Sequence, residues 1–333
     1  MKLVFTILAF LPVALFAQNK LPFIESITSD TFNGKYQHII FKYDQDNRVT
    51  NIIETNCKTQ KKSPTDVFPL IDTLSIQTFT YNGRSKNPVS RKITNFKFDP
   101  VEKAAYWTYI QNYVFIYRKG KHVQDSIMNK RNRLRVDEDN KDNDKPYYWK
   151  GKIEYSNKAI VYHVDRNYLS KHMYESTYGS TTEILINNQH NIEKEAEEEL
   201  IKSHTAPNPP YYTYTKFDKA INPFSYLNIA GSIPNEKIYL SYNINYLIGK
   251  KVDYIGPGYT DFNWYFFNQN NITNYSITRG ETDSDFSDVI HLSYNYNKFN
   301  LPTQCFAEIR KEYRSDGTLV GTHQKRFTFR YKN

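Results

Sequence analysis

The feature that most constrains this chain is a short pattern that returns along it: alternating apolar and polar residues, a closing aromatic residue, then a turn. In FKYDQDNRVTNII, residues 41–53, Phe41 and Tyr43 are two positions apart, so they share one face of a strand. Asp, Gln and Asn follow, which tolerate tight turns, and alternation then resumes. This stretch therefore predicts a β-hairpin.

The hairpin pattern repeats along the chain. Its clearest copies are roughly 35–40 residues apart, enough for two strands and a connection, and they end at Tyr43, Tyr81, Tyr117 and Tyr155. Weaker copies lie near Ile186, Phe217, Phe267 and Tyr296, and the chain closes on a strand at Tyr331. Because an isolated hairpin is only marginally stable in water, neighbouring units must pair. The sequence predicts an all-β fold, a long antiparallel meander that is curled or folded into a sandwich or an open barrel-like sheet.

Aromatic residues support this fold class. They make up 16% of the chain, with 29 Tyr and 21 Phe, whereas Met occurs only 3 times. Flat rings pack well across neighbouring strands, and a tyrosine hydroxyl can stay hydrated at the edge of a core. The composition therefore argues against a helical bundle.

Two stretches interrupt the strand pattern. IEKEAEEELIKS, residues 192–203, is rich in helix formers, acidic early and basic late, and predicts a short helix. The proline-rich HTAPNPPYY that follows is the best candidate for a domain boundary. The chain then has either two hairpin-repeat sheets, residues 18–205 and 206–333, or one continuous sheet.

A second, smaller helix is predicted in INPFSYLNIAG. Asn222 suits the cap position, Pro223 suits the first helical turn, and Gly231 suits the end. This helix would decorate the sheet.

The first residues predict export. Lys2 precedes an apolar run over residues 3–16, and small Ala17 follows, which is typical of a cleavable signal peptide spanning residues 1–17. The alternative is an uncleaved anchor. The mature chain is expected in the periplasm, at the cell surface or outside the cell, touching the membrane only through this segment before cleavage.

Charge and cysteine content leave two questions open. The net charge of +9 is compatible with an anionic partner such as an acidic glycan or a membrane surface, whereas no nucleic-acid or cofactor-binding motif is present. Cys57 and Cys305 can form one disulfide in an oxidising compartment, or they can be two buried, unpaired thiols.

The Tyr43-Asp44 turn and the Arg48-Val49 return resemble the YD/Rhs type of repeat, in which hairpins add side by side. The later YTKFDKAINPF, LSYNYNKFNLPT and SDGTLVG pieces are similar to a group of exported, functionally uncharacterised bacterial proteins with YD-like hairpins and an Asn-Pro-Phe element. The resemblance implies a hairpin-repeat fold and export, and it supplies no catalytic residues.

Two aromatic clusters are candidate ligand sites. They hold Tyr148 and Trp149 in DKPYYWKGK, and Trp264, Tyr265 and Phe267 in FNWYFFNQNNITNY. Successive side chains of a strand point to opposite faces, so some of these rings are expected outside a one-sided core, where they suit sugar rings or a partner. The alternative is a sheet buried on both faces.

Acidic and histidine residues give weaker candidates for metal binding. Asp283, Asp285 and Asp288 in GETDSDFSD could supply oxygens to calcium, although turn formation explains the cluster more simply. His163 and Asp165 alternate on one strand and His172 follows, but their spacing matches no established ligand pattern.

No catalytic signature is present in the sequence. It contains no Gly-x-Ser-x-Gly, no His-Glu-x-x-His and no glycine-rich phosphate loop, and paired carboxylates would meet only in three dimensions. We therefore expect an exported, non-enzymatic β-repeat protein with a binding or structural role and no cofactor. The alternative is a glycan-binding or carbohydrate-active protein with an aromatic groove.

Overall fold

The computed structural model describes most of the chain after the N-terminal segment. The described residues are 21–30, 35–58, 73–98, 105–133, 147–156, 158–167, 177–201, 211–229, 237–239, 263–279, 286–313 and 316–332. The predicted signal peptide, residues 1–17, lies outside them. None of the described residues belongs to a helix long and apolar enough to cross a membrane.

The described residues form β-strands joined by turns. The strands are β1 (Phe23–Ser29), β2 (Lys35–Tyr43), β3 (Val49–Lys58), β4 (Thr73–Tyr81), β5 (Pro88–Phe98), β6 (Ala105–Arg118), β7 (Lys121–Arg133), β8 (Tyr147–Tyr155), β9 (Ala159–Asn167), β10 (Thr177–Ile186), β11 (Ile192–Ile201), β12 (Tyr211–Ile221), β13 (Lys237–Tyr239), β14 (Asn263–Tyr265), β15 (Asn270–Arg279), β16 (Phe286–Tyr296), β17 (Pro302–Tyr313) and β18 (Leu319–Lys332).

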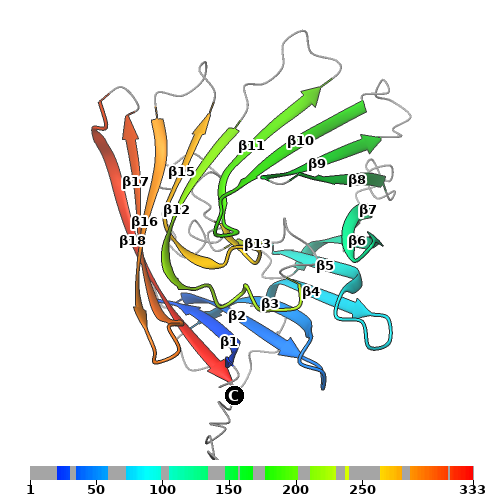
Figure 1. The fold of residues 1–333 in the computed structure, drawn as a ribbon, viewed down its shortest axis with the longest axis horizontal. Helices are drawn as coiled ribbons and strands as arrows, with labels where there is room; N and C mark the ends of the chain where they lie inside the picture. The colour runs from blue at the N-terminus through cyan, green and yellow to red at the C-terminus, as the bar shows by residue number, and fades with distance from the viewer. Residues whose placement is uncertain are drawn as a thin grey trace, which may run out of the picture.

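These strands build one closed antiparallel barrel (Figure 1). Each strand pairs with its neighbour in the chain, except that β12 pairs with β15, and β1 pairs with β18 to complete the ring. Strands β13 and β14 form a separate two-stranded sheet. The predicted all-β meander is confirmed, and it closes fully instead of folding into a sandwich or stopping as an open sheet.

The predicted helix at 192–203 is wrong, because Ile192–Ile201 is strand β11. On one side Glu197 pairs with Thr182 of β10, and on the other it pairs with Tyr211 of β12. Neighbouring strands thus supply hydrogen-bonding partners for the backbone, and this tertiary pairing overrides the helix propensity of the glutamates.

The proline-rich stretch at 204–212 does not separate two sheets. Its residues up to 210 lie outside the described part, but β11 and β12 on either side of it pair directly in the barrel. Of the two alternatives, the structure shows one continuous sheet.

The predicted helix after Asn222 is also wrong within the described residues 222–229, where two successive tight turns occur. The carbonyl of Asn222 accepts from the N–H of Ser225 at 3.0 Å, and the carbonyl of Phe224 accepts from Leu227 at 3.1 Å. Asn222 does cap the first turn, since its Oδ1 accepts from the N–H of Phe224 at 3.2 Å. These bonds span three residues, as in tight turns, and the turns place Phe224, Leu227 and Ile229 in the barrel core.

Several hairpins close with short turns of the same conformation. These turns lie at the end of the barrel where β1 starts and β18 ends. In each, the first side chain accepts two backbone N–H groups and the fourth residue has a positive φ of 58–60°. The first and fourth residues are Asp44 and Asn47, Asn187 and His190, and Asn297 and Asn300. Asn and Asp tolerate this geometry, as the turn patterns predict. We call this the turn end, and the opposite one the loop end.

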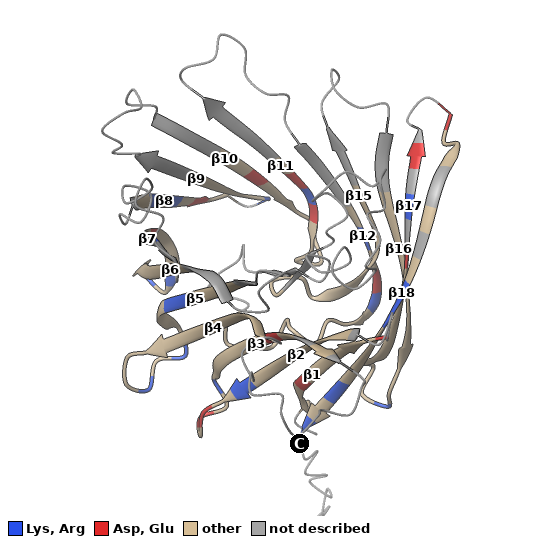
Figure 2. Cartoon of the chain, turned by 180° about the vertical axis from the view of Figure 1, so that it is seen from behind, with Lys and Arg blue, Asp and Glu red and all other residues tan. Residues whose placement is uncertain are grey.

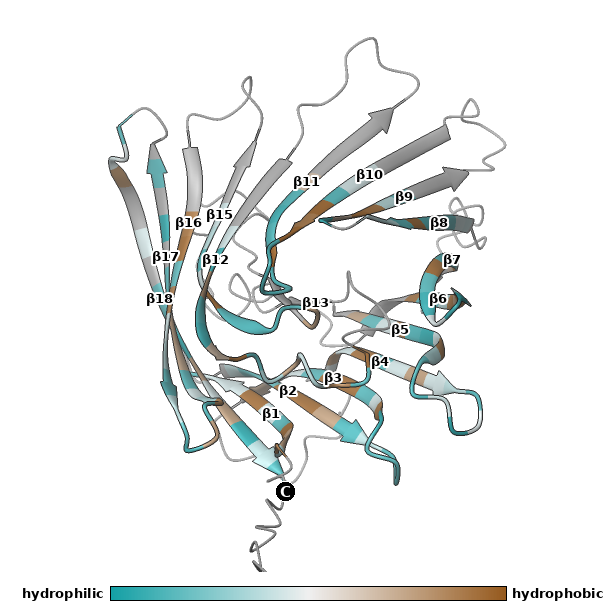
Figure 3. Ribbon diagram, in the orientation of Figure 1, coloured by the Kyte–Doolittle hydropathy of each residue, from teal (hydrophilic) through white to brown (hydrophobic). Residues whose placement is uncertain are grey.

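Burial alternates along the barrel wall. On β18, Phe327 and Phe329 are buried whereas Thr328 and Arg330 are exposed, and brown and teal bands alternate along the described strands (Figure 3). Buried apolar residues of β1 to β4, β6 and β15 to β18 form one cluster with residues 224–229, and those of β8 to β11 form a smaller one. The core therefore lies in the interior of the barrel.

The two cysteines do not form a disulfide. Cys57 on β3 and Cys305 on β17 are free thiols, and strands β2, β1 and β18 separate them in the ring. Cys305 is fully buried, and burial raises the pKa of its thiol. A bridge would require two chain segments four strands apart to meet.

Candidate functional site

The recurring tyrosines tie neighbouring strands together at the turn end. Each is at or near the end of its strand, and its hydroxyl donates to a carbonyl at the start of the preceding strand at 2.5–2.8 Å. These tyrosine clasps join Tyr43 to Ile24, Tyr81 to Val49, Tyr117 to Pro88, Tyr294 to Ile272 and Tyr331 to Pro302. Burial raises the pKa of the Tyr81 hydroxyl to about 12, so this clasp keeps its proton at neutral pH. Several of the repeated tyrosines, Tyr43, Tyr81, Tyr117 and Tyr331, thus make the same structural bond.

A segment between β12 and β15 enters the barrel, and we call residues 222–229 with 266–268 the plug. Figure 1 shows the chain after β12 crossing toward β3 and β4. Phe224 is buried, with its ring 5.9 Å from Phe41 on the wall and 5.2 Å from Phe266 on the returning limb. Leu227 and Ile229 join the same core. The plug therefore fills the turn end of the barrel from within.

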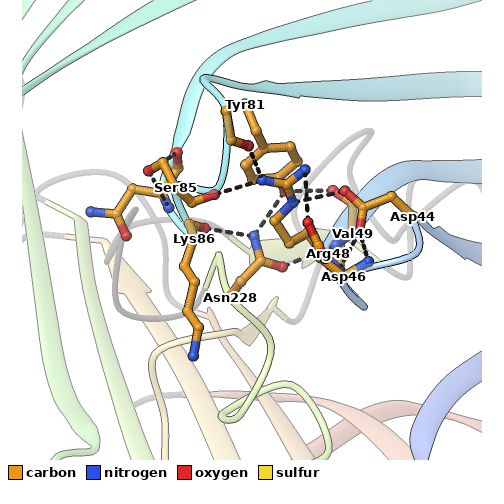
Figure 4. A network of polar contacts seen from close by, with 10 residues as sticks. Asp44, Asp46, Arg48, Val49, Tyr81, Ser85, Lys86 and Asn228 are labelled. Carbon is orange, nitrogen blue, oxygen red and sulfur yellow. Dashed lines mark hydrogen bonds and ion pairs between the residues drawn. The ribbon is translucent and has the colours of Figure 1, made fainter.

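Arg48 organises the two turns beneath the plug (Figure 4). Its Nε donates to Asp44 at 2.7 Å, and its Nη1 donates to the carbonyls of Gly83 and Ser85 at 2.7 and 2.9 Å. The guanidinium also lies 4.6 Å from the centre of the Tyr81 ring. Burial works to raise the pKa of Asp44, but hydrogen bonds from Arg48 outweigh it and lower that pKa.

Asn228 fastens the plug to this network. Its Oδ1 accepts from the backbone N–H of Val49 at 3.0 Å, and its Nδ2 donates to the Tyr81 hydroxyl at 2.8 Å and to the carbonyl of Lys86 at 3.0 Å (Figure 4). The Asn228 amide thus forms hydrogen bonds with the start of β3, with the clasp tyrosine of β4 and with the turn that follows β4. This contact fixes where the plug lies against β3 and β4.

Asparagines hold the other limb of the plug. The Oδ1 of Asn268 accepts from the backbone N–H of Ile192 at 2.7 Å, and its carbonyl accepts from the Asn222 side chain at 2.6 Å. Asn191 and Asn270 exchange two hydrogen bonds, each of 2.9 Å. Because an amide side chain offers both donors and an acceptor, this group satisfies buried backbone where β11, β12 and β15 meet, although Asn268 Nδ2 has no partner within the described residues.

A polar belt crosses the inner wall on β18, β2, β3 and β4. Lys325 is only 7% exposed, and within the described part of the chain its Nζ has no hydrogen-bond partner. Burial lowers its pKa to about 8, although the charges of Asp30 and Glu54 oppose the shift. Glu54 accepts from the side chains of Gln37 at 2.6 Å and Ser75 at 3.3 Å. The belt thus places a buried ammonium on a largely apolar wall.

A second buried polar group lies on β7 to β9. His122 and Asp125 are 1% and 2% exposed, and His122 Nε2 contacts Asp125 Oδ1. The hydroxyl of Tyr162 donates to Asp125 Oδ2 at 2.8 Å. The Tyr162 side chain lies against Gly151, where a Cβ would be 2.5 Å from the Tyr162 hydroxyl oxygen. Burial, followed by the charge of Asp125, raises the pKa of Tyr162. The sequence did not predict this polar group. A glycine inside a strand pattern is the one sequence feature that points to it.

The structure separates the first pair of predicted aromatic ligand residues. Tyr148 is 59% exposed on the outer face of β8, whereas its neighbour Trp149 is half-buried on the inner face. Phe267 packs against the small core cluster of Ile153, Ile160, Ile184 and Ile192. Trp264 and Tyr265 belong to β14, and their side chains lie outside the described part. An aromatic groove stays a prediction, and it cannot hold Tyr148 and Trp149 on one face.

The predicted acidic site is not covered by the structure. Asp283 and Asp285 lie outside the described residues, and Asp288 pairs through its backbone with Lys311 on β17. Over the described ranges, no three metal-ligating side chains come together. The calcium site at 283–288 stays a prediction.

The histidine alternative is similarly incomplete. His163 Nδ1 lies 3.0 Å from the hydroxyl of Thr181 on β10, so this ring has a hydrogen-bonding neighbour on the sheet. The Asp165 side chain and His172 are outside the described part. The structure thus does not test whether the three residues meet.

Comparison with known proteins gives similarity in structure alone. No protein-family model matches the chain, and no curated protein matches it significantly. Two solved porin-like proteins are similar to it in structure. The one from Bacteroides vulgatus has 12% identity and a TM-score of 0.45, and the match covers 94% of this chain and 99% of that one. The other, from Bacteroides uniformis, has 12% identity, a TM-score of 0.46 and coverage of 93% and 96%. At this distance neither carries an argument about function, and the barrel rests on its own strand pairing.

Proposed function

We propose that this chain is an exported, non-enzymatic binding protein whose barrel is a rigid frame with a water-facing outer wall. The plug closes the frame at the turn end, and the loop end presents the connections that meet a partner. The signal-like N-terminus supports export to the periplasm or beyond.

The observation that carries this proposal is the polarity of the barrel wall. On β18, the exposed residues are Gln324, Arg326, Thr328 and Arg330, and the buried ones are Lys325, Phe327 and Phe329. A membrane barrel has the opposite pattern, and each Arg or Lys facing lipid costs about 2–4 kcal/mol at the middle of the bilayer. The charged outer face therefore favours water around the barrel.

Other strands support the same orientation. Lys150 and Lys152 are exposed on β8, and Lys152 forms an ion pair with Glu154 at 2.5 Å. On β17, Arg310 and Glu308 form an ion pair at 2.8 Å. The Lys152–Glu154 pair is exposed, which is ordinary on a hydrated surface, whereas Arg310 and Glu308 are half-buried.

The turn end supports the role of a frame. Its hairpins are held by tyrosine clasps and by Asn228, whereas the connections at the loop end are longer and include the stretch with Asp283 and Asp285. Binding residues commonly lie on loops that a rigid scaffold positions. We therefore assign partner binding to the loop end.

Burial of an acid–base pair in the described part of the wall supports a non-enzymatic role. His122 and Asp125 resemble a general-base pair in residue type, but both are almost fully buried within the barrel wall. A catalytic base must reach the proton that it removes from the substrate. This pair is better explained as structural.

Solvent labelling tests the orientation of the wall. The chain lacking residues 1–17 is purified without detergent, and Thr328→Cys is introduced in a Cys57→Ser background. We expect rapid reaction of position 328 with a water-soluble maleimide, while buried Cys305 stays unreactive until the protein is unfolded.

The same preparation is added to planar lipid bilayers and to neutral phosphatidylcholine vesicles. We expect no stepwise conductance and no insertion. Protection of position 328 by lipid, a strict need for detergent, or channel opening would contradict the proposal.

A further inference from the structure

The turn end carries a concentration of positive charge on one sector of its edge. Six exposed cations lie in three hairpin turns, those joining β4 to β5, β6 to β7 and β8 to β9, and Figure 2 shows basic residues at the turn after β4. They are Arg84, Lys86, Arg118, Lys119, Lys121 and Lys158, and we call them the basic rim. None of the six forms an ion pair within the described part of the chain.

The three turns are neighbours in space as well as in sequence. Strands β5 and β6 pair, with Ser90 opposite Val114, which brings the first two turns together. Strands β7 and β8 also pair, and Lys121 lies 5.3 Å from the centre of the Tyr155 ring at the end of β8. The charges therefore form one continuous edge.

Few carboxylates offset this charge. Asp44 and Asp46 lie at one border of the rim, but both pair with Arg48, at 2.7 and 3.6 Å. Glu154 lies at the other border and pairs with Lys152. Within the described part of the chain, the carboxylates at both borders of the rim are therefore paired with cations outside it.

An exposed apolar group adjoins the same rim. Val89, Val114 and Ile116 are exposed on the outer face of β5 and β6, with Val114 at 53%. Val89 follows Lys86 of the first basic turn closely. Only Tyr117 separates Ile116 from Arg118 of the second turn. Aliphatic side chains beside unpaired cations make this sector amphipathic.

We propose that the basic rim and this apolar group dock the barrel on an anionic phospholipid surface. The cations would meet lipid phosphates, and the valines and isoleucine would enter the headgroup region, as amphipathic peripheral elements do. An acidic polysaccharide also attracts cations, but sugar rings favour aromatic partners, and the exposed apolar residues here are aliphatic. Docking through the turn end leaves the loop end facing away from the membrane.

Vesicle binding of the mature chain tests this proposal. Vesicles of phosphatidylglycerol and phosphatidylcholine in equal parts are compared with pure phosphatidylcholine, at low and high salt, by co-sedimentation. We expect binding only to the anionic vesicles, and release at high salt because screening weakens exposed charges. Binding to neutral vesicles that resists salt would overturn both this proposal and the water-facing wall, whereas no binding at all would overturn this proposal alone.

Matched variants locate the surface. The rim variant carries Lys86→Gln, Arg118→Gln and Lys121→Gln, and the control carries Lys216→Gln, Arg326→Gln and Arg330→Gln, which are exposed elsewhere on the wall. Each surface cation contributes roughly a fivefold factor to binding, so we expect the rim variant to bind at least about tenfold more weakly. The control should lose less than about threefold. Equal losses in both variants would mean that net charge alone acts, and the proposal fails.

Two further measurements complete the test. Val114→Ser with Ile116→Ser should weaken vesicle binding while leaving its salt dependence unchanged, and no effect would refute the apolar contribution. Retention on polygalacturonate beads without vesicle binding would assign the rim to acidic glycans and overturn the proposal. Circular dichroism and urea unfolding of every variant show whether it retains the wild-type fold.

Discussion

The plug divides the barrel interior into two unlike sides. Among the described side chains, it joins a large and nearly all-apolar cluster toward β1–β6 and β15–β18, and toward β8–β11 a small cluster of Ile153, Ile160, Ile184 and Ile192. Adjacent residues of the plug show the difference, since Phe266 packs into the first cluster and Phe267 against the second. The second side relies instead on asparagine side chains and on the group formed by His122, Asp125 and Tyr162.

The difference shows that one wall is stabilised by packing and the other by directed hydrogen bonds. Apolar packing depends on the area removed from water and tolerates small shifts. Buried polar groups require specific partners, and leaving one unpaired costs about 1–3 kcal/mol. Substitutions on the two sides should therefore differ in size and in the way that they combine.

The largest expected effect is on the apolar side. Phe224→Ala removes a fully buried ring from the centre of the plug and should lower the free energy of unfolding by about 3–5 kcal/mol in urea titration. Phe306→Ala is the control, because Phe306 is exposed on the outer wall, and it should change stability by at most about 0.5 kcal/mol. Similar losses for both would mean that the plug does not form the core.

On the polar side, Gly151→Ala should lower the free energy of unfolding by about 2 kcal/mol. The new Cβ would lie 2.5–2.8 Å from the Tyr162 hydroxyl oxygen and the nearest ring carbons. The Tyr162→Ala background removes the ring, so the cost of the added methyl group should disappear there. A double-mutant cycle measured by urea unfolding gives this coupling. Additive effects would show that Gly151 is needed for another reason.

The contact between plug and turns should have an intermediate effect. Asn228→Ala leaves the N–H of Val49 without its acceptor and removes the donor to the Tyr81 hydroxyl, at a cost of about 1–2 kcal/mol. Hydrogen exchange should then rise at Val49 more than at Ile192, which the other limb of the plug holds. Uniform acceleration at both amides would contradict a local role.

The smallest expected effect concerns the buried ammonium on the apolar side. Burial lowers the pKa of Lys325 to about 8 from its ordinary value of 10.5, so the unfolded chain binds its proton more tightly. Stability should therefore rise with pH above about 8, by about 1 kcal/mol between pH 7.5 and 9. Below both values Lys325 carries its charge in both states, and no dependence from this group is expected.

Lys325→Met provides the comparison for this pH effect. The variant should lack the rise, and the difference between the two proteins cancels the titration of Cys305 and the tyrosines. Urea unfolding at the two pH values measures it. If the free energy of unfolding changes by the same amount between the two pH values in wild type and variant, the Lys325 ammonium is hydrated in the folded state.

Local sequence features predicted the hairpins well. Alternation before Tyr43, Tyr81 and Tyr117 indicated strands, and these tyrosines indeed end paired strands. The same features failed at 192–203, where glutamates have high helix propensity but neighbouring strands supply the backbone partners. Propensity is a local quantity, and pairing with β10 and β12 is not.

The candidate sites were harder to predict. The sequence suggested Tyr148 and Trp149 as one candidate ligand site, but they lie on opposite faces of β8, and no pattern indicated that Asn228 would reach Val49 and Tyr81 from far along the chain. The buried group of Asp125 and Tyr162 was missed because its residues are common and scattered. The basic rim was visible only as net charge, since its cations are interspersed in the sequence and meet when the hairpins align.

Most strands and turns follow from the sequence, though not β11 or the turns at 222–229, because side-chain alternation and the turn preferences of Asn, Asp and Gly act between residues close in the chain. Tertiary structure alone decided that β1 meets β18, that residues 222–229 enter the barrel, and that the charged face points outward. Those outcomes depend on how many strands close the ring and on contacts between distant segments, whose free energy no local pattern records.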